Sequence, residues 1–222
     1  VVSKHFISFF LSLELLSIAL YVLIGYFRRE ATSIEASIKY LVMASASTAF
    51  LLFGLALIYA ETGTMHFPHL SSALSASGLS HQLFVLFGSA LILVAVGFKL
   101  AVVPFHMWTP DVYEGAYAPV TAYIATISKG AMVALLVRYF SAFNLPAYPA
   151  LLWALTGIAI LSMLLGNTLA LRQRNVKRLV AYSSIAHLGY ILVAFLVSGE
   201  NAVVAISYYV LAYSASLLII FG

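Results

Sequence analysis

Seven long apolar stretches follow one another along this chain of 222 residues, with polar connections between them. A helix needs about 20 mostly apolar residues to cross the hydrocarbon core of a bilayer. Stretches of roughly that length occupy residues 6–27, 38–60, 83–103, 119–140, 150–171, 179–197 and 202–222. The pattern therefore predicts an all-α fold, a polytopic transmembrane helix bundle with seven spans in this chain.

The connections leave no room for a water-soluble domain. The longest, residues 61–82, is rich in serine and contains histidine. The chain starts at Val1 and ends inside an apolar stretch at Gly222. We therefore expect residues 1–222 to form a single membrane domain that is a segment of a longer protein.

Composition excludes several classes of protein. Apolar residues make up 64% of the chain and charged residues only 8%, against about 25% charged in soluble domains, which excludes a water-soluble enzyme. The absence of cysteine excludes disulfides, thiolate metal sites and cysteine-bound iron–sulfur clusters in this chain. A net charge of +4 is too dilute for a nucleic-acid surface.

The basic residues are distributed asymmetrically among the connections. Counting seven spans puts the basic segments 28–39 and 172–178 on one side of the membrane. That side carries Arg28, Arg29, Lys39, Arg172, Arg174, Lys177 and Arg178, and the other carries Lys4 and Arg138. By the positive-inside rule the richer side is cytoplasmic, and we expect an integral protein of a bacterial inner membrane.

Glu14 is a charged residue within the first apolar stretch. A charge at the centre of a bilayer costs about 3 kcal/mol on insertion scales, so such residues are usually functional. Ser17 and Tyr21 follow on the same helical face and form a polar stripe with it. The alternative is a structural carboxylate that is hydrogen-bonded to a neighbouring helix.

Two lysines also lie within apolar stretches. Lys99 stands between Gly97 and Pro104, which disrupt helices, so the sequence predicts a broken helix near 99–104 that exposes the lysine to water. The alternative is a lysine that snorkels to the membrane surface. Lys129 is the eleventh residue of 119–140, shares its face with Thr121 and Thr126, and is too central to snorkel.

His187 lies centrally in 179–197, with hydroxyl groups on its face. An imidazole titrates near neutral pH, so this residue suits proton transfer as well as packing, and the sequence favours neither role. In the connection after the predicted break, Thr109 and Pro110 suit the start of a short helix and Trp108 suits a membrane-interface anchor.

His106 and Glu114, in the same connection, are possible proton donors to Lys99. The sequence contains no phosphate-binding glycine-rich loop and no HExxH zinc motif. It therefore indicates no metal site and no redox cofactor in this chain. Ionisable residues on four different helices indicate instead a path for protons or cations.

Five segments resemble one known family. Residues 97–116 read GFKLAVVPFHMWTPDVYEGA, followed by APVT at 118–121 and SKG at 128–130. Together with EASIKY at 35–40 and VKRLVAYSSIAHLGY at 176–190, they resemble the subunit N family of proton-pumping NADH:quinone oxidoreductase (respiratory complex I). The TPDVYEG motif distinguishes this family from the related subunits L and M and from multisubunit sodium/proton antiporters.

The resemblance implies an antiporter-like fold of about fourteen helices built as two inverted repeats, of which this chain holds helices five to eleven. It implies that Glu14, Lys99, Lys129 and His187 form a proton relay, whose last lysine lies beyond Gly222. Tyr117 departs from the proline usual in the family. The implied partners are other membrane subunits of complex I and the lipid bilayer, with NADH, FMN, iron–sulfur clusters and quinone bound in other subunits.

Two other functions remain open at this stage. A cation/proton antiporter subunit without a redox partner would have nearly the same residues. A retinal protein with Lys129 as the Schiff-base lysine is a weaker alternative, because that lysine is expected on the last span, which has none. The sequence does not distinguish ubiquinone from menaquinone or plastoquinone, or transport of H⁺ alone from transport that includes Na⁺.

Overall fold

The structure is a computed structural model that describes residues 5–66, 68–70, 82–142, 148–197 and 200–222. Lys4 and most of the 61–82 connection lie outside these residues. The described chain is mainly helical: α1 (Phe6–Ile24), α2 (Ala31–Thr62), α4 (Gln82–Leu100), α5 (Trp108–Gly115), α6 (Ala118–Tyr123), the π-helical turn Ile124–Ser128, α7 (Lys129–Ala142), α8 (Pro149–Ala170), α9 (Val176–Leu196) and α10 (Glu200–Phe221).

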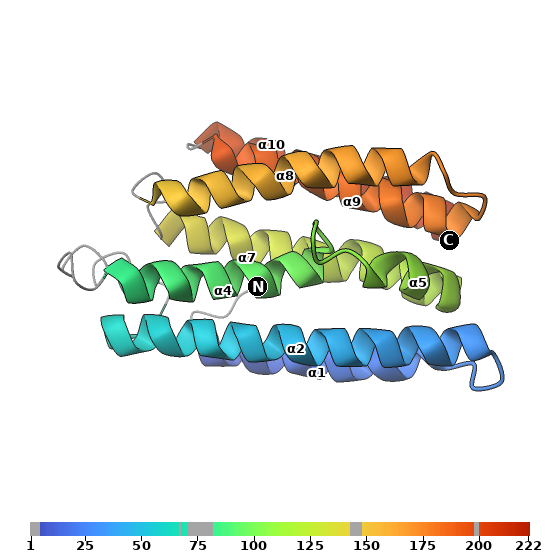
Figure 1. Ribbon diagram of the computed structural model, residues 1–222, viewed down its shortest axis with the longest axis horizontal. Coiled ribbons are helices and arrows are strands. Elements are labelled where there is room, and N and C mark those ends of the chain that lie inside the picture. The colour runs from blue at the N-terminus through green and yellow to red at the C-terminus, as the bar shows by residue number, and fades with distance from the viewer. Residues whose placement is uncertain (1–4, 67, 71–81, 143–147, 198–199) are drawn as a thin grey trace.

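Seven helical segments among the described residues are long and apolar enough to cross a membrane, which confirms the predicted spans. The fourth is continuous from Ala118 to Phe140 and includes α6, the π turn and α7. Figure 1 shows the long helices running along the same axis, with α1 and α2 on one side, α8 to α10 on the other, and α4 and α7 between them.

The connections after α1 and after α8 lie at the same end of the bundle as α5 (Figure 1). This arrangement agrees with the prediction that the two basic segments share one side of the membrane. At this end, two serines of α2 close the end of α1: Ser33 Oγ donates to the carbonyl of Ile24 at 2.7 Å and Ser37 Oγ to that of Tyr21 at 2.8 Å. The first bond satisfies a carbonyl group that a helix leaves free at its C-terminus, whereas the carbonyl of Tyr21 also accepts from the N–H of Gly25 at 3.2 Å.

Small residues let the helices approach closely. A Cβ atom added at Gly54 of α2 would stand 2.7 Å from the carbonyl oxygen of Gly88 of α4, and one at Gly189 of α9 would stand 2.9 Å from that of Ala159 of α8. Lipid tails are as apolar as the helices, so close van der Waals packing is the main force that associates helices in a bilayer. These glycines therefore fix the α2–α4 and α8–α9 contacts.

The predicted break near residues 99–104 is present, and it begins at Ala101. Ala101 has φ 62°, a left-handed conformation. Its N–H donates to Phe98 O at 2.9 Å, and the N–H of Val102 donates to Gly97 O at 3.0 Å. This pair of bonds is the Schellman arrangement that ends a helix. The chain then turns through residues 101–107 before α5 begins at Trp108.

Trp108 is not the membrane-interface anchor that the sequence suggested. Its side chain is only 3% exposed. Its indole N–H donates to the carbonyl of Phe98 at 3.0 Å, a group in the last turn of α4. The residue therefore fastens α5 to the broken end of α4, because a buried indole N–H needs an acceptor.

Candidate functional site

Lys99 lies in the last turn of α4 and is buried, with 6% of its surface exposed. Its Nζ atom donates to Ser17 Oγ of α1 at 2.6 Å and stands 5.6 Å from the centre of the Tyr40 ring of α2. The carbonyl end of a helix and the face of an aromatic ring both attract a cation. The break thus places the ammonium group where three helices supply partial negative charge.

Glu14, one helical turn before Ser17, is partly buried. Its carboxylate accepts a hydrogen bond of 2.6 Å from Thr48 Oγ1 of α2. Among the described side chains Glu14 and Lys99 make no direct ion pair: each is held by a hydroxyl group on a neighbouring helix. The structure brings the two groups to one face of α1 but keeps them apart, so their pairing stays a prediction.

Lys129 is the most deeply buried charged residue described, with 1% of its surface exposed. Its Nζ atom donates to Ser184 Oγ of α9 at 2.5 Å and stands 5.4 Å from the centre of the Tyr113 ring of α5. Lys129 directly follows the π turn. A π turn is a local departure from the regular helix that often occurs at functional sites.

The two threonines expected beside Lys129 do not hydrogen-bond to it. Thr126 Oγ1 donates to the carbonyl of Ala122 at 2.7 Å, and Thr121 Oγ1 donates to that of Tyr117 at 3.2 Å. Both bonds lie on the helix that carries the threonines. The extra residue in the π turn changes the register between these positions and Lys129, which a regular helical period does not anticipate.

Ser184 is the point at which several side chains meet. In addition to Lys129, its Oγ atom accepts from Tyr213 OH of α10 at 2.6 Å and lies 3.3 Å from Tyr113 OH. The serine, both tyrosines and the lysine are buried. The sequence indicated only that hydroxyl groups share the face of His187, and it did not indicate either tyrosine, since nothing marks them among the 14 tyrosines of the chain.

His187 follows Ser184 by one helical turn on α9 and is partly buried. Its Nδ1 atom is 2.7 Å from Tyr209 OH, and its ring centre is 5.5 Å from that of Tyr213. The histidine therefore belongs with Lys129 and Ser184. The predicted residues divide into two groups: Glu14 with Lys99, and Lys129 with His187.

His106, a predicted proton donor, lies in the turn between α4 and α5. Its Nδ1 atom is buried and has no hydrogen-bond partner, and burial lowers the pKa of this imidazole. The expectation that Thr109 caps α5 is wrong: the cap is Met107, two residues earlier, and the Thr109 hydroxyl is buried without a partner. The bond from Trp108 to α4 moves the helix start before the threonine.

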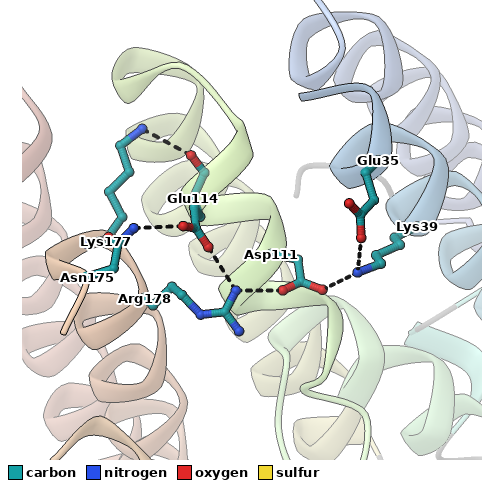
Figure 2. Close-up of polar contacts among 7 residues, drawn as sticks. All are labelled: Glu35, Lys39, Asp111, Glu114, Asn175, Lys177 and Arg178. Atoms are coloured by element: carbon teal, nitrogen blue, oxygen red, sulfur yellow. Dashed lines mark hydrogen bonds and ion pairs between the residues drawn. The ribbon is translucent and has the colours of Figure 1, made fainter. Parts of the chain in front are cut away.

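An ionic cluster joins α2 and α9 to α5 at the end of the bundle that carries the basic connections (Figure 2). Lys39 contacts Glu35 at 2.6 Å and Asp111 at 2.7 Å, and Arg178 contacts the other oxygen of Asp111 at 2.8 Å. Partial burial opposes ionisation of Asp111, but the hydrogen bonds from Lys39 and Arg178 outweigh it and lower its pKa.

Glu114, the other predicted proton donor, belongs to the same cluster. Its carboxylate accepts from Arg178 at 2.9 Å and from Asn175 Nδ2 at 2.8 Å, as Figure 2 shows. Lys177 Nζ donates to the carbonyl of Ala116 at 3.0 Å, just after α5. The described contacts of Glu114 thus hold α5 against α9 and do not lead to Lys99.

Within the described parts of the chain, no group of three or more histidine, aspartate or glutamate side chains is arranged to hold a metal ion. The amine, hydroxyl, carboxyl and imidazole groups at the two lysines can donate, accept and hold protons.

Comparison with known proteins places this geometry in a family. Residues 3–222 match the family described as NADH:quinone oxidoreductase/Mrp antiporter, transmembrane. One relative is the NADH-quinone oxidoreductase subunit N of Nitrosospira multiformis, which is 56% identical over 193 residues. That alignment covers 87% of this chain and 38% of the relative, so the chain spans less than half of the relative's length.

Solved structures are similar over almost the whole chain. A chain of respiratory complex I from Thermus thermophilus is 36% identical with a TM-score of 0.79, over 98% of this chain and 47% of that one. A chain of the Mrp complex from Dietzia sp. is 25% identical with a TM-score of 0.85, over 98% and 41%.

A chain of an archaeal membrane-bound sulfane sulfur reductase is 29% identical with a TM-score of 0.89, over 99% and 44%. All three structures are of complexes, and two of these complexes are respiratory. The match to the family extends over both lysine groups, the break between α4 and α5 and the π turn. This chain is therefore an integral membrane protein that belongs to the NADH:quinone oxidoreductase/Mrp antiporter transmembrane family.

Proposed function

We propose that this chain is the central part of a complex I subunit N and that it carries protons across the membrane through its buried ionisable residues. The observation that supports this most is the burial of Lys99 and Lys129 on separate helices, each hydrogen-bonded to a serine. Burial of a cation is costly unless it is compensated. Two such lysines are better explained by proton transfer than by packing.

In the proposed mechanism, Glu14 and Lys99 form an ion pair that opens and closes. Closing brings the carboxylate to the ammonium and offsets the cost of burying both. Opening leaves Lys99 without a counter-charge, so the lysine releases its proton. The structure is consistent with an open arrangement, because Thr48 and Ser17 hold the two groups separately.

The released proton passes through ordered water to Lys129 and then toward His187. The grouping of Lys129, Ser184 and His187 around one face of α9 supports this order. His106, with its unpartnered nitrogen in the turn after Lys99, is the better of the two proposed entry residues, because Glu114 is already engaged by Arg178.

The proposal extends to the assembly. The subunit would be a non-redox part of an NADH:quinone oxidoreductase, driven by quinone reduction elsewhere in the complex. NADH, FMN, iron–sulfur clusters and quinone would be bound by other subunits, and the partners would be other membrane subunits and lipid. The name of the Nitrosospira relative and the complex I structure support this assignment.

For orientation, we propose that segments 28–39 and 172–178 face the cytoplasm of a bacterial cell. Their position at one end of the bundle and their excess of basic residues support it. A cysteine introduced by Arg174→Cys should react with a membrane-impermeant reagent from the cytoplasmic side, and one introduced by His69→Cys from the other side. Reaction of both from one side would overturn the orientation.

A second candidate function is that of a cation/proton antiporter subunit, because the Mrp chain is similar over nearly the whole segment. The two functions differ in their energy source. The full-length protein in its native complex, reconstituted in vesicles, should take up protons when NADH and quinone are added, without any sodium gradient. Proton movement that follows only a sodium gradient, with no NADH oxidation, would establish the antiporter function instead.

A further inference from the structure

The hydrogen bonds at Ser184 leave no unused capacity on its hydroxyl group. A serine hydroxyl has one hydrogen to donate and two lone pairs to accept with. Lys129, as an ammonium, can only donate, and Tyr213 donates as well, at 2.5 and 2.6 Å. Both lone pairs are then occupied, and the hydrogen of Ser184 is left for Tyr113 OH at 3.3 Å.

This arrangement holds only while Lys129 is charged. A neutral amine has a lone pair and becomes an acceptor. Ser184 is its hydrogen-bond partner, so the nearest hydrogen for that lone pair is the one Ser184 donates to Tyr113. Loss of the lysine proton therefore favours rotation of the Ser184 hydroxyl away from the tyrosine and toward the amine.

The surroundings of Lys129 offer no stronger polar partner among the described residues. The ionisable groups that act on it are Tyr113 from α5, whose ring faces the ammonium, and His187 from α9, by electrostatic interaction, while Tyr213 from α10 donates to the same serine. No described carboxylate is paired with the lysine. Ser184 is thus the group that compensates the buried ammonium by a direct hydrogen bond.

We propose that Ser184 is a positioning residue that holds the charged form of Lys129 and transfers its own hydrogen bond from Tyr113 to the lysine once the proton has left. The proposal rests on the proposed function of Lys129 in proton transfer. Tyr113 belongs to α5, whose first residue, Trp108, is bonded to Phe98 beside Lys99. A continuous series of contacts therefore runs from the end of α4 beside Lys99, through Trp108 and Tyr113 of α5, to Ser184 and Lys129.

The test compares two buried serine–tyrosine pairs in the assembled complex. Ser184→Ala removes the hydroxyl beside Lys129. Ser89→Ala removes an equally buried hydroxyl that is 2.7 Å from Tyr139 OH, with no lysine in that contact. The measurement is the rate of NADH-driven proton uptake in vesicles as a function of pH, with assembly checked on native gels.

Ser184→Ala should shift the alkaline fall of the uptake rate by about one pH unit toward lower pH, because the charged lysine loses the hydrogen bond that stabilises it. Ser184→Thr restores the hydroxyl and should restore the profile. Ser89→Ala should leave the profile in place. A wild-type profile for Ser184→Ala, or an equal shift for Ser89→Ala, would overturn the proposal.

If Ser184→Ala fails to assemble, Ser184→Cys replaces it with a weakly bonding thiol, and the same shift is expected. Lys129→Met separates this inference from the proposed function. Normal uptake by assembled Lys129→Met would refute proton transfer through the lysine. Loss of uptake in Lys129→Met, together with an unshifted profile in Ser184→Ala, would refute the role of Ser184 and leave the proposed role of Lys129 standing.

Discussion

The two buried lysines have the same immediate partners but differ in helical setting. Lys99 and Lys129 each donate to one serine and each lie over one tyrosine ring. Lys99 stands at the carbonyl end of α4, where the helix breaks, and contacts the face of α1 that carries Glu14. Lys129 stands inside a continuous span, after a π turn, with no described carboxylate as a partner.

In the proposed mechanism, this difference gives the two lysines different roles in proton transfer. Lys99 has compensation from a helix end and a nearby acid, so its charge can be modulated by movement of Glu14. In the proposed mechanism, Lys129 is compensated by one hydroxyl group and one aromatic ring and exchanges its proton without a described carboxylate partner. The comparison predicts that changes at Lys99 depend on Glu14, whereas changes at Lys129 do not.

The largest effect is expected when arginine replaces Lys129. A guanidinium hardly deprotonates in a protein, so Lys129→Arg should reduce proton uptake by at least about tenfold, as removal of an acid–base group does. Lys99→Arg should also reduce uptake, because Lys99 must release its proton in the proposed mechanism. Proton uptake in vesicles measures both, and normal uptake by an assembled Lys129→Arg complex would contradict proton transfer through this lysine.

A double-mutant cycle tests the link between Glu14 and Lys99. Glu14→Gln and Lys99→Ala should each reduce uptake by about tenfold, because each leaves its partner uncompensated. If the residues act as a unit, the double variant should lose little more than either single one. Losses that add fully would show that the two residues act independently, and the opening-pair mechanism would fail.

The next effect concerns α5, which lies between the two lysine groups. A Cβ atom at Gly115 would stand 2.6 Å from the carbonyl oxygen of Thr32 and 2.7 Å from Ala36 Cβ of α2. Gly115→Ala should therefore destabilise the complex by about 1–3 kcal/mol. Gly157→Ala is the matched control, since nothing lies within 4 Å of its added Cβ. Thermal unfolding in detergent compares them, and equal stability would show that α5 does not need this close approach.

The smallest effect is expected in the ionic cluster. Asp111→Asn keeps the side-chain shape but removes the charge that Lys39 and Arg178 share, at a cost of about 1 kcal/mol or less for partly exposed pairs. The pKa of Asp111 is lowered, so its stabilisation is complete above the ordinary pKa and disappears as the pH falls through the lowered one. The stability difference from wild type should shrink below about pH 4; an undiminished difference in acid would exclude this ionisation.

The membrane-spanning helices were predictable from the sequence because a helix that crosses a bilayer must be apolar over about 20 residues. All seven spans follow from hydropathy, and the count of spans gives the common end of the basic segments. The break after Lys99 follows from Gly97 and Pro104 instead. The start of α2 was placed seven residues late, at 38 instead of Ala31, because its first turns contain Ser33, Glu35 and Ser37 and lie beyond the apolar stretch. Hydropathy reports the apolar length of a helix and not its hydrogen-bonded length.

The partners of the charged residues were not predictable. Lys99, Lys129 and Glu14 could be identified from the sequence because each is a charged residue inside an apolar stretch, where a charge is costly. Their partners Ser17, Thr48, Ser184 and Tyr213 depend on which helices are neighbours, and a single sequence does not carry that information. The π turn before Lys129 also escaped detection, since one extra residue in a turn leaves no hydropathy signal.

The most direct test of the proposed proton path is simultaneous measurement of proton uptake and NADH:quinone turnover by the complete complex carrying Lys129→Met. Methionine keeps the length and apolar stem of the lysine but cannot carry a proton, and removal of a buried charge does not in itself unfold the bundle. We predict an assembled complex, verified on native gels, in which uptake and the turnover coupled to it are both much reduced. Normal proton uptake by an assembled Lys129→Met complex would contradict the proposed path.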